Sequence, residues 1–538
     1  MKQGLIFLLA VGVCLFFTGI SPADQPGEKM PGQVVKFAVH TSGIGHLDPH
    51  LARGSQDFTF ADMVFNSLVR YVSGDLSRLE PDIAESIPRF HIQDGRQVWT
   101  IHLKKGIFFH PGPFNPAYEL TAEDVVFSLN KAADPAYSSI AGEYTGMTFQ
   151  KKDDFTLEII VEKPVSPLFF LPIIANHRGG YILSQKAIAA GGYDAFAAHP
   201  VGTGPFMFDR YIPDEKCVLT AHARYFRGPP KLAGVEICFI PDNDAREAAF
   251  KSGEMDLILG VGDPGWISRM KKEPRTIIDV FGPGSTGLFH FNSAVKPLDD
   301  IRVRQAIVHV LDRDEFLAAS TRELVTPVLA PMSADFLPGG IPNEKINALG
   351  MNPGTDVEKA RNLMAAAGFA EGFSMTLYGS EKRVFKTAYE ILQKALATIG
   401  ISVDLKIVSH SLYHQMIREN RNAIVLYFSL RPNADAYLRG FFHSDASVQT
   451  GISAYTNFSH CNVVDSLLDN ALLEIDPEKQ IRLWEQAQLK ILHDVLVYPL
   501  LDIKYCVARR PNLDYGHDLI STLAGYPQFD ERTFLATP

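Results

Sequence analysis

The sequence is poor in the residues and spacings that build redox and metal centres. Only five of its 538 residues are cysteines, and no two of them form a Cys-x-x-C pair. Without that spacing, neither a zinc site nor dithiol redox catalysis is supported. His40, His46 and His50 lie in one loop-like stretch, but their spacing fits no standard ligand pattern. We therefore expect no resident metal and no cofactor.

The common motifs of hydrolytic catalysis are also missing. The chain contains no G-x-S-x-G nucleophile elbow and no H-E-x-x-H pair. Its adjacent carboxylates, Asp153-Asp154 and Asp299-Asp300, are typical of turns and helix caps and not of an acid–base dyad. We expect no enzyme and no catalytic residue. A secreted hydrolase remains the alternative class.

Charge of one sign is not concentrated anywhere in the chain. The net charge is −10, and acidic and basic residues are mixed, with no basic block or basic-aromatic stripe. A nucleic-acid partner is therefore not expected. With 46% hydrophobic and 21% charged residues, the composition is that of an ordinary soluble globular protein. The length suffices for two or more domains.

Long apolar runs are absent except at the N-terminus. Lys2 precedes an almost unbroken apolar run from Leu5 to Phe17, and Ser21-Pro22-Ala23 offers small residues for cleavage. This pattern predicts a signal peptide over residues 1–23, cut after Ala23, and export to a bacterial periplasm. A membrane anchor is disfavoured because a spanning helix needs about 20 apolar residues.

The cysteines leave two alternatives open: lipid attachment at Cys14 and disulfide formation among the other four. A lipoprotein would use Cys14, but Val13 is bulky where the processing signal needs a small residue. Four cysteines remain after cleavage: Cys217, Cys238, Cys461 and Cys506. Export permits disulfides, and the two on neighbouring strand-like segments, Cys217 and Cys238, are the best candidate pair. Buried free thiols are an equally good interpretation.

The stretch Val98–Ala133 organises the first part of the chain. Trp99, Ile101 and Leu103 alternate with polar residues, which predicts a half-buried strand. After a loop, Thr121 can act as the N-cap of an amphipathic helix with acidic residues in its first turn.

As a string, the same stretch resembles the signature of the family 5 extracellular solute-binding proteins, the peptide-, dipeptide- and nickel-binding receptors of ABC importers. The resemblance is carried by L-K-K-G-I-F-F-H and T-A-E-D-V-V-F-S-L, although Pro111 replaces the usual Asp and the loop is longer. Further motifs recur in the family's order at Gly202–Phe206, Gly253–Leu257 and Pro297–Ile307. In these motifs, glycine permits close backbone approach or a helix C-cap.

The resemblance implies an α/β fold: a two-lobe periplasmic-binding-protein clamp of type II, with the extra subdomain of the peptide-binding class. Residues 32–285 and 498–538 would form lobe I, and residues 286–497 would form lobe II. The chain would cross between the lobes near Gly282–Phe291 and Val497–Leu501. Within lobe II, helix and strand patterns alternate, which predicts a largely parallel sheet.

The resemblance also points to a ligand-binding segment, Tyr427–Leu438. Family members carry an Asp there that binds a peptide's α-amino group, whereas this chain has Leu430 and Arg431 at that place. Arg431 would favour a carboxylate instead, because its guanidinium can pair with it bidentately. We predict Arg431, Tyr427, Asp435 and His443 as ligand-binding residues. Trp266 and Tyr455 are further aromatic candidates, and Asp435 is alternatively a helix cap.

The resemblance predicts the substrate-binding component of an ABC transporter. It would be a monomer that captures a small solute, such as a peptide or a peptide-like carboxylated compound, and delivers it to a permease in the inner membrane. A chemoreceptor or chaperone accessory would use the same clamp with another partner. Family identity constrains the class of function much better than the ligand.

Overall fold

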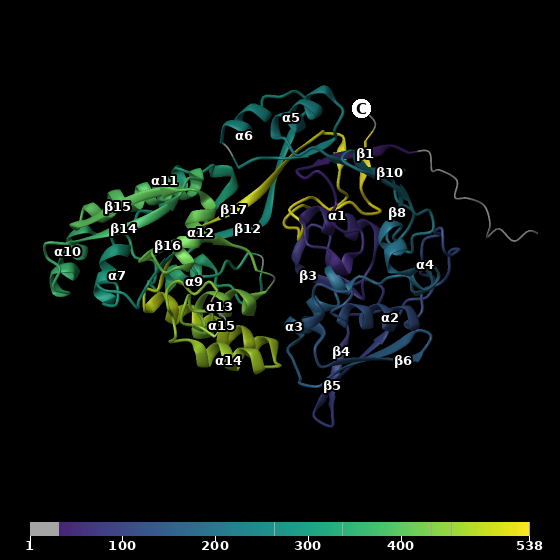
Figure 1. Cartoon of the computed structure of the whole chain (residues 1–538), viewed down its shortest axis with the longest axis horizontal. Helices are drawn as coiled ribbons and strands as arrows, with labels where there is room; N and C mark the ends of the chain where they lie inside the picture. Colours follow the sequence, from purple (N-terminus) through teal and green to yellow (C-terminus); the bar gives the residue numbers. More distant parts are fainter. Residues whose placement is uncertain (1–31, 263, 336, 432, 453–454, 537–538) are drawn as a thin grey trace, which may run out of the picture.

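Two lobes are joined by a long pair of strands in the computed structural model, which describes residues 32–536 apart from 263, 336, 432 and 453–454 (Figure 1). The strands β12 (Ile277–Phe291) and β17 (Val497–Arg509) pair antiparallel, with a bulge between Phe281 and Ser285. One end of the pair packs in the first hydrophobic core and the other in the second. The predicted signal peptide lies outside the described residues.

A nine-stranded sheet runs through both lobes in the order β16-β12-β17-β11-β1-β10-β9-β8, with β13 beside β17. The strands other than β12, β16 and β17 are β1 (Val34–Val39), β8 (Phe206–Ile212), β9 (Lys216–Ala221), β10 (Gly234–Phe239), β11 (Leu257–Leu259) and β13 (Val325–Pro327). Because the sheet is continuous, the backbone hydrogen bonds between its strands fix the position of each lobe.

The first lobe carries a subdomain built on a separate four-stranded sheet. Its order is β4-β5-β7-β6, and α2 and α3 lie in the same region (Figure 1). The bounds are β4 (Arg89–Gln93), β5 (Arg96–His102), β6 (Met147–Asp153), β7 (Thr156–Val161), α2 (Ala122–Ala133) and α3 (Pro167–Ile173). The rest of this lobe comprises α1 (Ser55–Val64), β2 (Val69–Val72), β3 (Asp75–Pro81), α4 (Gln185–Ala198), α5 (Asn243–Ser252) and α6 (Pro264–Met270).

The second lobe packs helices around β12, β16 and a two-stranded parallel sheet. Its strands are β14 (Phe373–Ser380), β15 (Ile401–Val408) and β16 (Ile424–Ser429). Its helices are α7 (Ile301–Val308), α8 (Arg313–Ala318), α9 (Asn343–Ala348), α10 (Val357–Ala366), α11 (Arg383–Ala397), α12 (His410–Arg418), α13 (Ala434–Phe442), α14 (Asp465–Leu473) and α15 (Pro477–His493). No helix within the described residues combines the length and apolarity needed to cross a membrane.

The predicted helix caps, which depend on neighbouring residues alone, are confirmed. Thr121 is the N-cap of α2, and its backbone N–H donates to Asp124 at 3.0 Å. Asp300 caps α7, and Gly253 ends α5 with φ 89°. A Cβ atom on Gly202 would lie 2.0 Å from the carbonyl oxygen of Val64, which explains the glycine in that motif.

The predicted largely parallel sheet of the second lobe is wrong in part. Strands β14 and β15 are parallel, but β16 pairs antiparallel with β12. Helix–strand alternation reports only local connections, whereas β12 comes from much earlier in the chain. The Asn422 amide joins the two sheets, since it accepts from the Tyr378 N–H at 2.9 Å and donates to the Tyr378 carbonyl at 2.8 Å.

The candidate disulfide is also wrong, and all four described cysteines are buried free thiols. In the β9–β10 ladder, Cys217 lies opposite Ile237, and Cys238 lies opposite Lys216. The two cysteines therefore point to opposite faces of the sheet, because side chains alternate along a strand. Cys217 belongs to the first core, whereas Cys238 packs in a separate small cluster. Burial raises the pKa of both thiols, which makes them unreactive.

We expect the mature chain, unfolded without reductant, to release four thiols per molecule to a thiol-reactive dye, as the four free cysteines require. A sample reduced before unfolding is the control and should give the same value. A value near two thiols in the unreduced sample alone would show that a disulfide forms.

Candidate functional site

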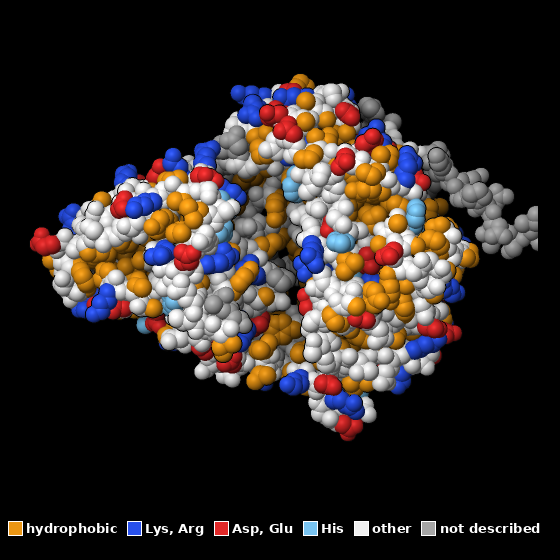
Figure 2. Space-filling view, viewed as in Figure 1, with side chains coloured by type: hydrophobic (Ala, Val, Ile, Leu, Met, Phe, Trp, Pro, Cys, Tyr) orange, Lys and Arg blue, Asp and Glu red, His pale blue; other side chains and the backbone are white. Residues whose placement is uncertain are grey.

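A hollow separates the two lobes, and Figure 2 shows it running down the middle of the molecule. Besides the paired strands, α3 makes a contact between the lobes, as does the ion pair between Lys271 and Glu323 at 3.0 Å. Leu168 and Phe169 of this helix pack against the second core, and the Phe169 ring lies 5.9 Å from the indole of Trp484, centroid to centroid. The strand pair and this apolar contact therefore bound the hollow.

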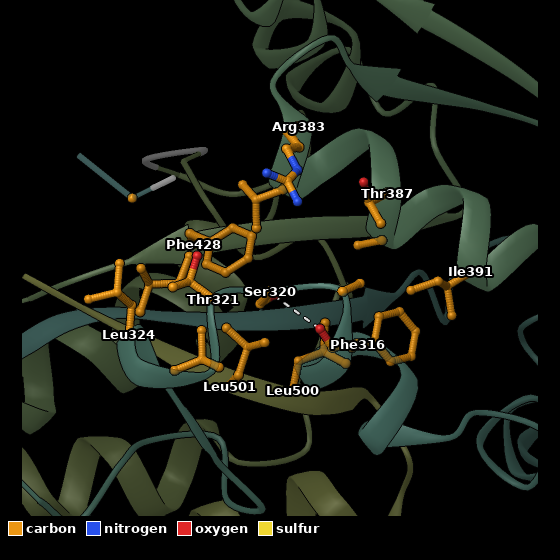
Figure 3. A pocket seen from close by; sticks show the side chains of 16 residues that line it. Phe316, Ser320, Thr321, Leu324, Arg383, Thr387, Ile391, Phe428, Leu500 and Leu501 are labelled. Carbon is orange, nitrogen blue, oxygen red and sulfur yellow. Dashed lines mark hydrogen bonds between the residues drawn. The ribbon is translucent and has the colours of Figure 1, made fainter. Parts of the chain in front are cut away.

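A pocket of about 230 Å³ opens beside the strand pair (Figure 3). The second lobe supplies most of its wall, from α8, the short helix Arg322–Leu324, α11, β16 and β17. Gly262, which follows β11, lines it from the first lobe. Apolar side chains dominate the wall, among them Phe316, Leu324, Val384, Ile391, Phe428 and Leu501. Arg383 is the one charged residue among the described residues that line the pocket.

The pocket floor is a cross-strand row in which Gly287 of β12 lies between Phe428 of β16 and Leu501 of β17. A Cβ atom on residue 287 would lie 2.3 Å from Cε1 of Phe428, so the glycine leaves the space that the ring occupies. The next row runs through Thr286 and Asp502 and faces the other side of the sheet. Thr286 donates to the Asp502 carboxylate there, at 2.5 Å.

Strand β16 is the edge of the nine-stranded sheet, and its outer backbone groups face away from β12. Two buried tyrosines cover the first part of that edge. The Tyr389 hydroxyl donates to the Ile424 carbonyl and accepts from the Leu426 N–H, while the Tyr413 hydroxyl donates to the Leu426 carbonyl. Because outward groups recur every second residue, the N–H and C=O of Phe428 point to the same edge. No strand pairs with β16 on that side in the described chain.

Tyr427 and Arg431, two of the predicted binding residues, lie together around Phe441. The Tyr427 ring is 5.7 Å from the Phe441 ring and 5.2 Å from the Phe458 ring. The Arg431 guanidinium lies over Phe441 at 5.0 Å, and its Nη1 donates to the Leu430 carbonyl at 3.0 Å. Tyr427 is therefore held by aromatic packing, and Arg431 presents a cation at the end of β16.

Asp435 does not cap the following helix, contrary to the alternative that the sequence left open. Asn433 is the N-cap of α13, and its side chain accepts from the Ala436 N–H at 2.8 Å. Asp435 Oδ1 is buried and has no hydrogen-bond partner among the described residues. Burial raises the pKa of this carboxyl to about 6, while Arg439 and His443 oppose the shift.

His443 is buried and uses both ring nitrogens within the second lobe. Nδ1 accepts from the Asp445 N–H at 3.1 Å, which caps the short helix Ser444–Ala446, and Nε2 lies 3.3 Å from Asp469 Oδ1. Arg439 binds the same oxygen at 2.8 Å. The structure thus brings His443 and Asp435 together around Arg439. All four remain predicted binding residues.

The other aromatic candidates differ from each other. Trp266 is buried in a small cluster with Phe250 and Met270, whereas Tyr455 is 53% exposed and lies under Arg431, 5.9 Å from the guanidinium. Arg383 and Thr387 also line the pocket but were not predicted from the sequence. Their i, i+4 spacing on a helix was the only local signal, and it is common on helix surfaces.

We expect Asp435→Asn to stabilise the protein at pH 8 and to have almost no effect at pH 4. The folded carboxyl has a pKa of about 6, above that of the unfolded chain, so the folded state is penalised as pH rises through this interval. The gain at pH 8 should reach about 2 kcal/mol. Denaturant unfolding of both proteins at the two pH values measures it.

The exposed Asp404 on β15 provides the matched control, because Asp404→Asn makes the same replacement at the surface and should change stability little. An Asp435→Asn effect that does not depend on pH would contradict the assigned burial of this carboxyl.

Known proteins share both the sequence and the fold. Residues 78–449 match the model of the bacterial extracellular solute-binding proteins, family 5, middle region. Heme-binding protein A of Haemophilus influenzae is 26% identical, with 95% of this chain and 94% of that protein covered. The dipeptide-binding protein of Escherichia coli is also 26% identical, with 80% and 82% covered.

Two solved structures are similar over nearly the whole chain and confirm the predicted fold class. The solute-binding protein MoaA of A. tumefaciens R10, in complex with mannopinic acid, is 32% identical with a TM-score of 0.69, and 94% of this chain and 100% of that chain are covered. HbpA2 of Haemophilus parasuis is 24% identical with a TM-score of 0.77, with 92% and 99% covered. The chain belongs to family 5 of the bacterial extracellular solute-binding proteins, which bind solutes for ABC transporters and catalyse no reaction.

Proposed function

We propose that this receptor captures a peptide or a peptide-like carboxylated compound between its two lobes and delivers it to an inner-membrane permease. The mature protein would begin after Ala23 and act in the periplasm. Residues 32–285 with 498–538 and residues 286–497 would be the two closing units. These boundaries fall within β12 and at the start of β17, the two strands that pair between the lobes.

The free edge of β16 is the observation that carries the proposal. The Phe428 N–H and C=O point outward there, next to a pocket and without a pairing strand in the described chain. A ligand with an amide or carboxylate group can form the missing ladder hydrogen bonds, as an added strand does. Such pairing binds the peptide-like backbone of a ligand, whereas pockets bind the ligand's side chains.

The charges around this edge favour a carboxylate over an ammonium group. Arg431, two residues beyond the end of β16, presents its guanidinium there. No acidic residue lines the pocket among those described, and the Asp435 carboxyl is buried in α13. A guanidinium pairs with a carboxylate through two parallel hydrogen bonds. The mannopinic acid bound to the 32% identical relative is a carboxylated compound of this kind.

Mass spectrometry of compounds released on unfolding the purified mature protein tests the proposal, together with a thermal-shift screen of peptides and organic acids. We expect a carboxylated compound to raise the melting temperature, because a ligand that binds only the folded state stabilises it. Exclusive stabilisation by compounds without a carboxylate would contradict the proposed class.

Arg431→Ala should weaken binding of the identified carboxylated ligand by about tenfold to hundredfold, since it removes a charge-assisted hydrogen-bond donor. Titration calorimetry measures the change. Arg418→Ala is the matched control, because Arg418 lies beside the same Tyr455 ring but on the exposed side of α12. Equal affinities of Arg431→Ala and the unaltered protein would remove Arg431 from the binding site.

A further inference from the structure

We propose that the pocket beside Phe428 is a subsite for an apolar branch of the ligand, with a size between that of a leucine and a phenylalanine side chain. The receptor would then select carboxylated compounds that carry such a branch over compounds of the same backbone without it. The carboxylate of this ligand rests on the proposed function, whereas its apolar branch is inferred from the pocket itself.

The wall of the pocket leaves little for a polar branch to bind. The Ser320 hydroxyl donates to the Phe316 carbonyl at 3.0 Å, so it is already satisfied within its own helix turn (Figure 3). The Thr321 hydroxyl, which is buried and has no partner among the described residues, is an exception to this apolar wall. The remaining wall is dominated by aliphatic and aromatic carbon from α8, α11, β16 and β17.

The volume sets the size of the branch. At about 230 Å³, the pocket exceeds the engineered apolar cavity of roughly 150 Å³ that binds benzene in a small protein. A phenyl or isobutyl group therefore fits with room for its connecting methylene. Burial of each additional methylene should raise affinity about fourfold, as expected from its transfer out of water.

The position of the pocket links the branch to the backbone of the ligand. Phe428 contributes its ring to the pocket floor and its N–H and C=O to the free edge of the sheet. Arg383 and Thr387 lie on one face of α11 at the rim (Figure 3). A compound paired with the edge of β16 would thus present its side group to the apolar wall of the pocket.

Binding of N-acetylated amino acids tests the subsite, because these compounds have a carboxylate and an amide but no free amine. The series is N-acetylglycine, N-acetylalanine, N-acetylleucine and N-acetylphenylalanine, measured by titration calorimetry. We expect the leucine and phenylalanine compounds to bind at least tenfold more tightly than the alanine compound. Equal affinities across the series would overturn the subsite and leave the carboxylate receptor intact.

Three variants separate the pocket from general effects on the protein. Thr387→Phe fills the pocket from α11 and should abolish the gain for the larger branches. Lys386→Phe places the same ring on the exposed side of the same helix and should preserve the gain. Thr321→Val keeps the volume and removes the unpartnered hydroxyl, so the gain should also persist. Loss of the gain in Thr321→Val would overturn an apolar subsite in favour of a polar one.

The dye 1-anilinonaphthalene-8-sulfonate, an apolar anion, covers the case in which no N-acetylated amino acid binds. Its fluorescence should rise with the unaltered protein and with Lys386→Phe, but at least threefold less with Thr387→Phe. That result would support the apolar subsite, even though the failure of N-acetylated amino acids to bind would count against the proposed class of ligand. Equal fluorescence for all three proteins would overturn the subsite. Circular dichroism and melting temperature confirm that each variant is folded.

Discussion

The antiparallel pairing of β12 with β17 is the constraint on which the rest of the molecule depends. Its register runs from Ile277 opposite Arg509 to His290 opposite Val497, and it enters both hydrophobic cores. Because main-chain hydrogen bonds fix this ladder, the lobes can change their relative orientation only by bending or twisting the same two strands. The ladder therefore holds the two lobes together as parts of one continuous sheet.

The same ladder also separates two chemical environments. Phe428, Gly287 and Leu501 form a row on the pocket side, while Thr286 and Asp502 belong to the next row and face the helices on the other side. A shift of one residue in the register would exchange the apolar floor for a buried carboxylate. The composition of the pocket is thus a consequence of sheet register as much as of residue type.

Features set by a few neighbouring residues could be predicted from the sequence, and features set by distant strands could not. Thr121, Asp300 and Gly253 act as helix caps because capping depends on the side chain or backbone conformation of residues within one turn. The family and its fold followed from motif order. The antiparallel place of β16 and the opposite directions of Cys217 and Cys238 depend on strand pairing, which a single sequence does not encode locally.

The contact between Phe169 and Trp484 affects how easily the two lobes can separate. Leu168 and Phe169 of α3 extend from the first lobe toward the second core, where Trp484 is 1% exposed. Separation of the lobes at α3 would expose this apolar contact to water, which disfavours the separation. A solute that bound between closed lobes would then need to supply less energy for closure, because this contact already favours the closed arrangement.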